Sequence, residues 1–276
     1  VIIYNKISQR YFAYTPSLCY THHPKVHILL SVSPMPIVEH VVNRDIVAAS
    51  IGGGFLFQKN EMKFNPPAVG EVLRFFNHQI EQDHSVIAVI GGGPRARRNI
   101  ELAKARGVTN PLELDTVGIR VTQENARLIE ELARRCNLPI QIHEFGSVIH
   151  RGVIYIRGGD KPGHTTDYVA VQASHEAGQN ILLNITAVPG VHPVQKGIID
   201  KNTIIETISL DTYLQTIAPP SHAPGINTVF ERPGAELARE YGMTIVIIGG
   251  KNPLLVFSNV RKFLKGENFT GTVIHP

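Results

Sequence analysis

A loop near the middle of the chain places a carboxylate, a histidine and two threonines together. Residues 158–167 read Gly-Gly-Asp-Lys-Pro-Gly-His-Thr-Thr-Asp, between an apolar run and a helical pattern. A helix cap formed by Thr166 or Asp167 would explain part of this loop, but not ten successive polar, glycine or proline residues. Phosphoryl transfer needs a carboxylate near the reacting oxygens, with positioning groups around it. We therefore predict that Asp167 is the carboxylate of a phosphoryl-transfer site.

Glycines follow four separate apolar runs of the chain. They are Gly52-Gly53-Gly54, Gly91-Gly92-Gly93, Gly158-Gly159 and Gly249-Gly250. A backbone without Cβ atoms lets N–H groups approach an anion, and a helix N-terminus adds partial positive charge. Tight strand-to-helix turns would explain one such loop, but four of them predict a phosphate-like ligand. Neither the Walker A pattern nor the dinucleotide-binding fingerprint is present in the sequence.

Charged residues near these loops are the next candidates. Arg95, Arg97 and Arg98 follow the second glycine loop, in a helical turn where the helix dipole prefers acids. A guanidinium matches a phosphate in fork geometry, so we predict that Arg97 contacts an anion and that Arg95 and Arg98 form a solvated basic face. Asp115, at the start of a helical pattern, fits both a helix N-terminal acid and a carboxylate that binds sugar hydroxyls.

Strands and helices that would hold these loops alternate along the chain. Short, continuous, β-branched apolar runs predict strands buried on both faces of a parallel sheet. The predicted strands cover residues 45–51, 86–90, 153–156, 181–185 and 244–248. The predicted helices cover residues 66–81, 94–105, 126–133, 168–177, 233–241 and 254–264. This alternation indicates a layered α/β domain.

Composition excludes several classes of protein. The first 38 residues carry three of the 27 basic residues and no acid, which leaves 24 basic against 23 acidic residues in the rest. A nearly neutral body predicts no nucleic-acid partner. No run reaches the roughly 18 apolar residues of a membrane span, and two cysteines predict a reducing, cytoplasmic setting. The 13 histidines form no HExxH motif, so we predict no metal site held by protein ligands.

Domain boundaries follow from the same pattern. Residues 1–38 show no helical or strand periodicity, and we expect a poorly ordered N-terminal extension that could also be a transit peptide. Residues 39–276 contain no low-complexity linker, and we expect them to form a single domain.

The order of the motifs resembles the amino-acid kinase superfamily, specifically the archaeal-type uridylate kinases. The most specific match is the loop from Gly158 to Asp167, and the supporting matches are Gly91 to Arg97, Asp115 to Ala126 and Gly266 to Ile274. The resemblance implies a three-layer αβα sandwich with a mainly parallel central sheet. It also implies an acceptor half at about residues 39–170, a nucleotide half at about 171–276, and a homohexamer.

The same resemblance implies roles for individual residues. The acceptor, uridine monophosphate (UMP), would contact Gly92, Asp115, Lys161, Pro162, Gly163, His164, Thr165 and Thr166. The transferring phosphates would be held by Gly53, Gly54, Gly93 and Arg97, with Asp167 organising the phosphoryl group. The site of the donor, ATP with Mg²⁺, would be lined by Thr186 and His192.

Departures from the family pattern concentrate in the nucleotide half. Gly54 lies where the family pattern has a serine, Pro189 where it has an aspartate, and His192 where it has an aromatic residue. Glu231-Arg232 lies where the family pattern has Asp-Pro. An active nucleoside monophosphate kinase is therefore one hypothesis. The alternative is a non-catalytic relative, either a nucleotide-binding pseudokinase or an oxyanion store similar to the molybdenum storage proteins.

Overall fold

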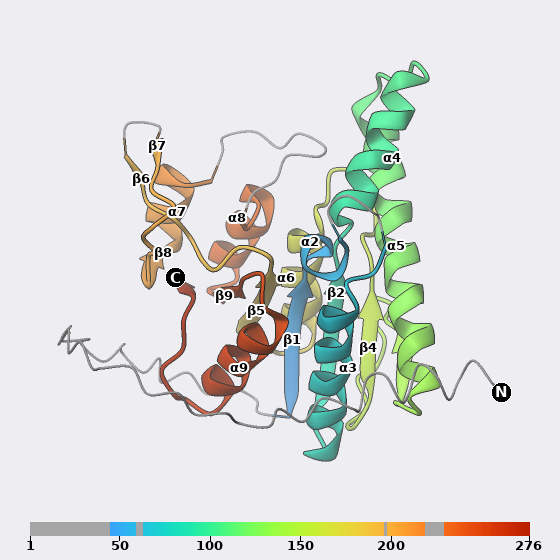
Figure 1. Ribbon diagram of the computed structural model, residues 1–276, viewed down its shortest axis with the longest axis vertical. Helices are drawn as coiled ribbons and strands as arrows, with labels where there is room; N and C mark the ends of the chain where they lie inside the picture. Colours follow the sequence, from blue (N-terminus) through green and yellow to red (C-terminus); the bar gives the residue numbers. More distant parts are fainter. Residues whose placement is uncertain (1–44, 59–62, 196–197, 219–228) are drawn as a thin grey trace, which may run out of the picture. The chain divides into compact units, whose positions relative to one another are not determined.

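A computed structural model describes residues 45–58, 63–195, 198–218 and 229–276 of the chain (Figure 1). The extension predicted over residues 1–38 lies outside the described residues. The strands are β1 (Ile46–Ile51), β2 (Ser85–Ile90), β3 (Ile140–Ile142), β4 (Ile154–Arg157), β5 (Ile181–Thr186), β6 (Val194–Gln195), β7 (Ile198–Ile199), β8 (Thr207–Ser209), β9 (Thr244–Gly249) and β10 (Thr272–His275). The helices are α2 (Gly53–Leu56), α3 (Pro66–Glu81), α4 (Gly93–Ala105), α5 (Pro111–Arg135), α6 (Thr166–Glu176), α7 (Leu210–Thr216), α8 (Arg232–Glu240) and α9 (Pro253–Leu264).

One sheet of eight strands organises the domain. Its order is β3-β4-β2-β1-β5-β9-β10-β8, and all neighbours are parallel except β9 and β10. The five predicted strands form its centre, and each lies within one or two residues of its predicted limits. Because the central strands are parallel, the glycine loops that follow β1, β2, β4 and β9 all leave the same edge of the sheet. The predicted, mainly parallel sheet is therefore confirmed.

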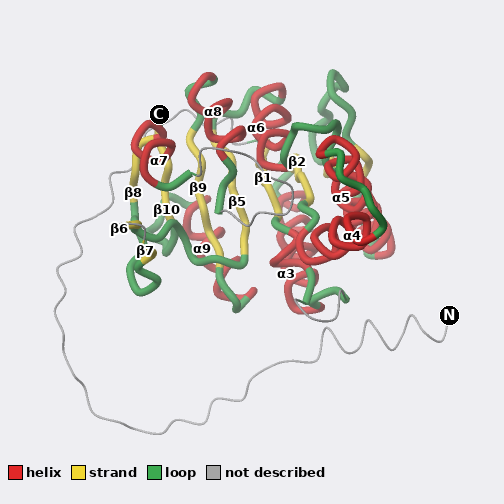
Figure 2. Tube along the Cα trace, turned by 90° about the horizontal axis from the view of Figure 1, so that it is seen from above, coloured by secondary structure: helices red, strands yellow, loops and turns green. Residues whose placement is uncertain are grey.

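Helices cover both faces of this sheet. Buried apolar side chains of α3, α5 and α9 pack on one face, and those of α6, α7 and α8 pack on the other. Figure 2 shows α3 and α9 on the opposite side of the strands from α6 and α8. The predicted three-layer αβα sandwich is confirmed. No helix of the described segments has both the length and the apolar character needed to cross a bilayer.

Helix α5 is longer than the apolar periodicity predicts. Its N-cap is Asn110, whose side chain accepts the Leu112 N–H at 2.9 Å, and Pro111 occupies the first helical position. Asp115 therefore lies within the first turns of α5, ahead of the segment 126–133 in which the apolar spacing was clear. The short strands β3, β8 and β10 were not predicted, since three or four residues carry too little periodicity.

Candidate functional site

The first two glycine loops pack directly against each other. A Cβ atom built on Gly53 would lie 2.4 Å from Gly93 N, and one built on Gly93 would lie 2.2 Å from Gly53 C. Gly93 also has a φ of +59°, which L side chains rarely adopt. Gly54 differs, because its Cβ would meet nothing within 4 Å. Glycine is thus required by packing at residues 53 and 93, whereas Gly54 opens into free space.

Helix α5 ties two of the strand-end loops together. Asn125, which is fully buried, donates its side-chain N–H to Gly91 O at 2.9 Å. Thr122 accepts the Gly159 N–H at 2.7 Å, and the Gln123 side chain donates to Gly159 O at 3.0 Å. We did not predict these roles, although the three-residue spacing of Thr122 and Asn125 on one helical face could have indicated them. These side chains fix the loop after β2 and the loop after β4 to one helix.

Asp167 lies in the first turn of α6, at the centre of the site. Its Oδ1 accepts the Ser50 hydroxyl at 3.2 Å, and its Oδ2 accepts the Glu231 backbone N–H at 3.0 Å. The residue is partly exposed, but its carboxylate is enclosed; this burial, followed by the negative charge of Glu231, raises the pKa of Asp167 to about 7. The two hydrogen bonds oppose this rise without cancelling it. A carboxylate that titrates near neutral pH is typical of functional sites.

The loop between β4 and α6 contacts Asp115. The Asp115 carboxylate accepts the Gly163 N–H at 2.9 Å, so two predicted acceptor-binding residues that are far apart in sequence lie together. His164 approaches Asp160 at 3.2 Å, and its ring packs at a tilt of 39° against the Tyr168 ring. Lys161 and Pro162 are exposed. The loop therefore presents its Lys161-to-His164 portion around the start of α5.

Helix α6 is capped by Thr165 rather than by Thr166 or Asp167. The Thr165 hydroxyl accepts the Tyr168 N–H at 3.1 Å, and Thr165 is buried. The cap lies one residue before Thr166 and two before Asp167, because the helix begins at Thr166. This leaves the Asp167 carboxylate free of a capping role and available to Ser50 and Glu231.

The predicted arginines differ in their surroundings. Arg95 donates hydrogen bonds to Asn125 and Glu124, and its guanidinium lies 5.3 Å from the Phe57 ring. It is an internal structural residue rather than part of a solvated face. Arg97 is partly buried, and across the described segments it has no hydrogen-bond or ion-pair partner. The five N–H donors of Arg97 are therefore not used by other described residues.

Thr186 and His192, the two residues predicted to line the ATP site, have different surroundings. Thr186 accepts the Gly250 N–H at 3.0 Å through its carbonyl, and the neighbouring Ile185 carbonyl accepts the Gly52 N–H at 2.8 Å. Thr186 thus lies between the first and fourth glycine loops. The His192 ring instead contacts the Thr203 carbonyl at 2.7 Å. No contact in the described part of the chain joins His192 to a glycine loop.

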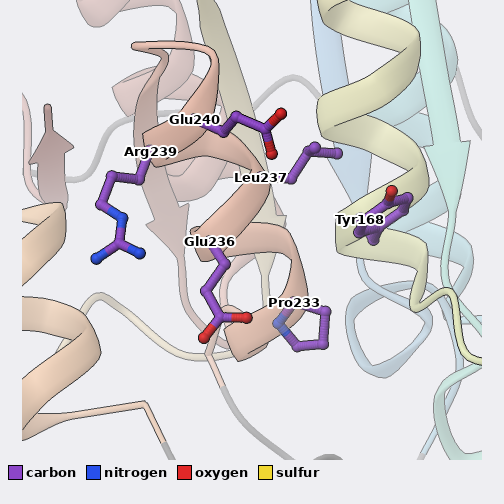
Figure 3. A pocket seen from close by; sticks show the side chains of 6 residues that line it. All are labelled: Tyr168, Pro233, Glu236, Leu237, Arg239 and Glu240. Carbon is purple, nitrogen blue, oxygen red and sulfur yellow. The ribbon is translucent and has the colours of Figure 1, made fainter.

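A surface hollow of about 580 Å³ lies between α6 and α8 (Figure 3). Its lining residues are Tyr168, Pro233, Glu236, Leu237, Arg239 and Glu240. Glu236 is paired with Arg232, and Arg239 with Asp211. This hollow is distinct from the glycine loops, which contribute nothing to its lining, but Tyr168, the neighbour of Asp167, is one of its lining residues.

Comparison with known proteins identifies a common family. The family model described as the amino acid kinase family matches residues 45–249. The uridylate kinase of Haloquadratum walsbyi is 32% identical over 235 residues, which is 83% of this chain and 93% of that protein. The uridylate kinase of Halorubrum lacusprofundi is 30% identical over the same shares of both chains. The crystal structure of a UMP kinase from Bacillus anthracis has the same fold, with a TM-score of 0.63 and 21% identity over 84% of this chain and 96% of that one.

Proposed function

The chain belongs to the amino acid kinase family, and we propose that it transfers the γ-phosphoryl group of ATP to UMP. The observation that carries the proposal is the enclosed Asp167 carboxylate, which lies where the first turn of α6 meets Ser50 of β1. In the reaction, a UMP phosphate oxygen forms a bond to the γ-phosphorus, and the bond from that phosphorus to the bridging oxygen of ADP breaks. The similarity to two uridylate kinases supports UMP as the acceptor.

Acceptor binding is assigned to the loop at Lys161–Thr166 and to Asp115. The Asp115 carboxylate accepts a backbone N–H from this loop, which places an acid beside the other residues assigned to the acceptor, and we assign it to a ribose hydroxyl. Gly92 lies at the start of α4, where backbone N–H groups and the helix dipole favour an anion. UMP held between these groups would point its phosphate toward the glycine loops.

Phosphate binding is assigned to the Gly53, Gly54 and Gly93 backbone and to the Arg97 guanidinium. A Cβ built on Gly54 would meet nothing within 4 Å, so open space lies beside this loop in which a phosphate could be held. Across the described residues, no group of three His, Cys, Asp or Glu side chains could hold a metal ion. We propose that Mg²⁺ enters with ATP as a co-substrate, where it would neutralise phosphate charge.

The experiment that tests this function measures ADP release with ATP, Mg²⁺ and UMP. We expect turnover with UMP to exceed that with the other nucleoside monophosphates, each at the same concentration. Thermal shifts with UMP alone and with ATP alone accompany the assay. Stabilisation by UMP but not by ATP, together with no ADP release, would show that the altered donor segment around Pro189 has lost ATP and would overturn the proposal.

Replacing Asp115 by asparagine tests the acceptor side. We expect the KM for UMP to rise about tenfold with kcat nearly unchanged, because a charged acceptor of the ribose and of the Gly163 N–H becomes neutral. Steady-state kinetics with UMP as the varied substrate measure this. Asp211→Asn is the control, since Asp211 is an exposed acid of α7 that pairs with Arg239. An equal loss of kcat and kcat/KM would contradict a binding role for Asp115.

Replacing Gly54 by serine tests the phosphate side. The change adds a hydroxyl in open space, so we expect an unchanged or slightly higher Tm and a KM for ATP that falls about two- to fivefold. The matched control is Gly53→Ser, whose Cβ would lie 2.4 Å from Gly93 N and should lower the Tm. A higher KM for ATP in Gly54→Ser would show that this space must stay empty.

A further inference from the structure

The segment that precedes α8 is held in place by two buried side chains. The Asn184 side chain, on β5, donates to Val229 O at 2.8 Å. The Tyr213 hydroxyl, on α7, donates to the next carbonyl, Phe230 O, at 2.6 Å. All of Phe230 and Tyr213 and nearly all of Asn184 are buried. Successive carbonyls of one strand-like segment are thus fixed to two separate elements.

The following residue delivers its N–H to Asp167. Glu231 is the N-cap of α8, and its backbone N–H lies 3.0 Å from Asp167 Oδ2. Because the carbonyls on its N-terminal side are anchored, this N–H has little freedom to move away from the carboxylate. The direction of the Asp167 carboxylate therefore depends on Val229 and Phe230 as well as on Ser50.

A glycine lets α8 come close to Asp167. A Cβ built on Gly234 would lie 3.0 Å from both the carbonyl carbon and the Cβ of Asp167, and 3.1 Å from Tyr168 N. Two of these three atoms belong to the backbone, which cannot rotate away as the end of a side chain would. Gly234 has ordinary helical geometry, so its role is the close approach of α8 to α6 rather than a special φ.

We propose that residues 229–234 form a positioning element for Asp167, in which Asn184, Tyr213 and Gly234 are positioning residues. The inference rests on the proposed phosphoryl transfer, because the value of a fixed carboxylate lies in its alignment with the reacting oxygens. Asn184 and Tyr213 act through side-chain hydrogen bonds to the backbone that leads to Glu231, and Gly234 acts through the close approach of its own backbone to Asp167.

Ionisable groups around Asp167 fit this arrangement. Glu231, at the start of α8, carries a negative charge that acts on Asp167, while α7 contributes the neutral Tyr213 and β1 the uncharged Ser50. Burial, followed by the charge of Asp167, raises the pKa of Tyr213 above its ordinary value. Tyr213 consequently stays protonated and remains a hydrogen-bond donor to Phe230 O at any pH at which the enzyme would work.

The test uses two small substitutions with matched controls. Tyr213→Phe removes only the hydroxyl, and Gly234→Ala adds only a methyl group against Asp167. We expect kcat to fall about 10- to 100-fold in each, with the KM for UMP changed less than about threefold. The controls are Tyr155→Phe, which removes the hydroxyl of another fully buried tyrosine that bonds His150 N, and Gly70→Ala, whose Cβ would meet only a flexible arginine end.

A second measurement does not depend on activity. In wild type, the amide resonance of Glu231 should shift with a midpoint near pH 7 as its acceptor Asp167 ionises. In both variants this shift should shrink by at least about half, because the N–H is no longer held on the carboxylate. If the wild type does not turn over UMP, the proposed function is overturned but the positioning inference is not. The pH-dependent shift of the Glu231 amide resonance then tests the positioning inference without any activity measurement.

Two outcomes would overturn the inference. One is a fall in kcat in Tyr213→Phe or Gly234→Ala that is no larger than the fall in its control, Tyr155→Phe or Gly70→Ala. This comparison applies where the variant and its control lose a comparable amount of Tm. The other is a Glu231 amide that follows the ionisation of Asp167 as fully in the variants as in wild type. A fall in kcat with the amide response lost, and with both controls near wild type, would support the positioning role.

Discussion

Replacing Asp167 by asparagine is expected to abolish phosphoryl transfer while making the folded protein more stable at alkaline pH. The amide keeps the size of the carboxylate. Its oxygen can accept the Glu231 N–H, and its NH2 group can donate to the Ser50 hydroxyl, which can rotate to accept this hydrogen bond. It cannot carry the negative charge that organises the transferring group. We expect kcat to fall about 10²- to 10⁴-fold in the ADP-release assay, with UMP binding retained.

The effect on stability follows from the raised pKa of Asp167. The carboxyl has an ordinary pKa of 3.8 and a folded-state pKa of about 7. Between these values the folded state binds more protons than the unfolded state, so wild-type stability falls as the pH rises through this range. Asparagine does not titrate. The Tm difference between Asp167→Asn and wild type should therefore be small near about pH 4, grow toward pH 7 and stay constant above it.

Asp211→Asn serves as the control for both readouts, because Asp211 is an exposed acid of α7 that pairs with Arg239. It should change neither kcat nor the pH dependence of the Tm. A stable Asp167→Asn variant that turns over UMP at the wild-type rate would remove Asp167 from the mechanism. A Tm difference that is the same at every pH would show that the carboxylate is not enclosed.

Replacing Gly93 by alanine is expected to have the largest effect on the fold of the site. The new Cβ would lie 2.2 Å from Gly53 C and 2.5 Å from Gly53 O, and the residue would have to keep a φ of +59°. Backbone atoms cannot move aside without separating the two loops. We expect the free energy of unfolding to fall by about 3 kcal/mol or more, with a large rise in the KM for ATP.

Gly107→Ala separates the two causes of this loss. Gly107 also has a positive φ, of +90°, but its Cβ would meet nothing within 4 Å. The free energy of unfolding of Gly107→Ala should fall by only about 1 kcal/mol, because backbone strain is its one cost. Urea unfolding of both variants, compared at equal m-values, measures the difference. Equal losses would mean that the contact between the Gly53 and Gly93 loops contributes nothing beyond the strain of a positive φ.

Much of the architecture was predictable because it depends on local properties of the chain. Continuous β-branched runs such as residues 86–90 form central strands because both of their faces are buried, and residues 66–81 show a helical stripe from the first turn to the last. Local patterns failed where residues are few or contacts are distant. Strand β10 pairs antiparallel to β9 and parallel to β8, and its four residues carry no information about either partner.

Residue types in contiguous motifs were enough to predict which class of ligand and reaction the site suits. Glycines after buried strands, Arg97 and the Lys161-to-Asp167 loop are contiguous motifs, and their residue types define what they can bind. The protonation of Asp167 was decided only by the tertiary structure. Its hydrogen-bond partners, Ser50 and Glu231, are 117 and 64 residues away in sequence. Burial and the charge of a distant residue change a pKa through space, so no sequence motif around residue 167 could have indicated it.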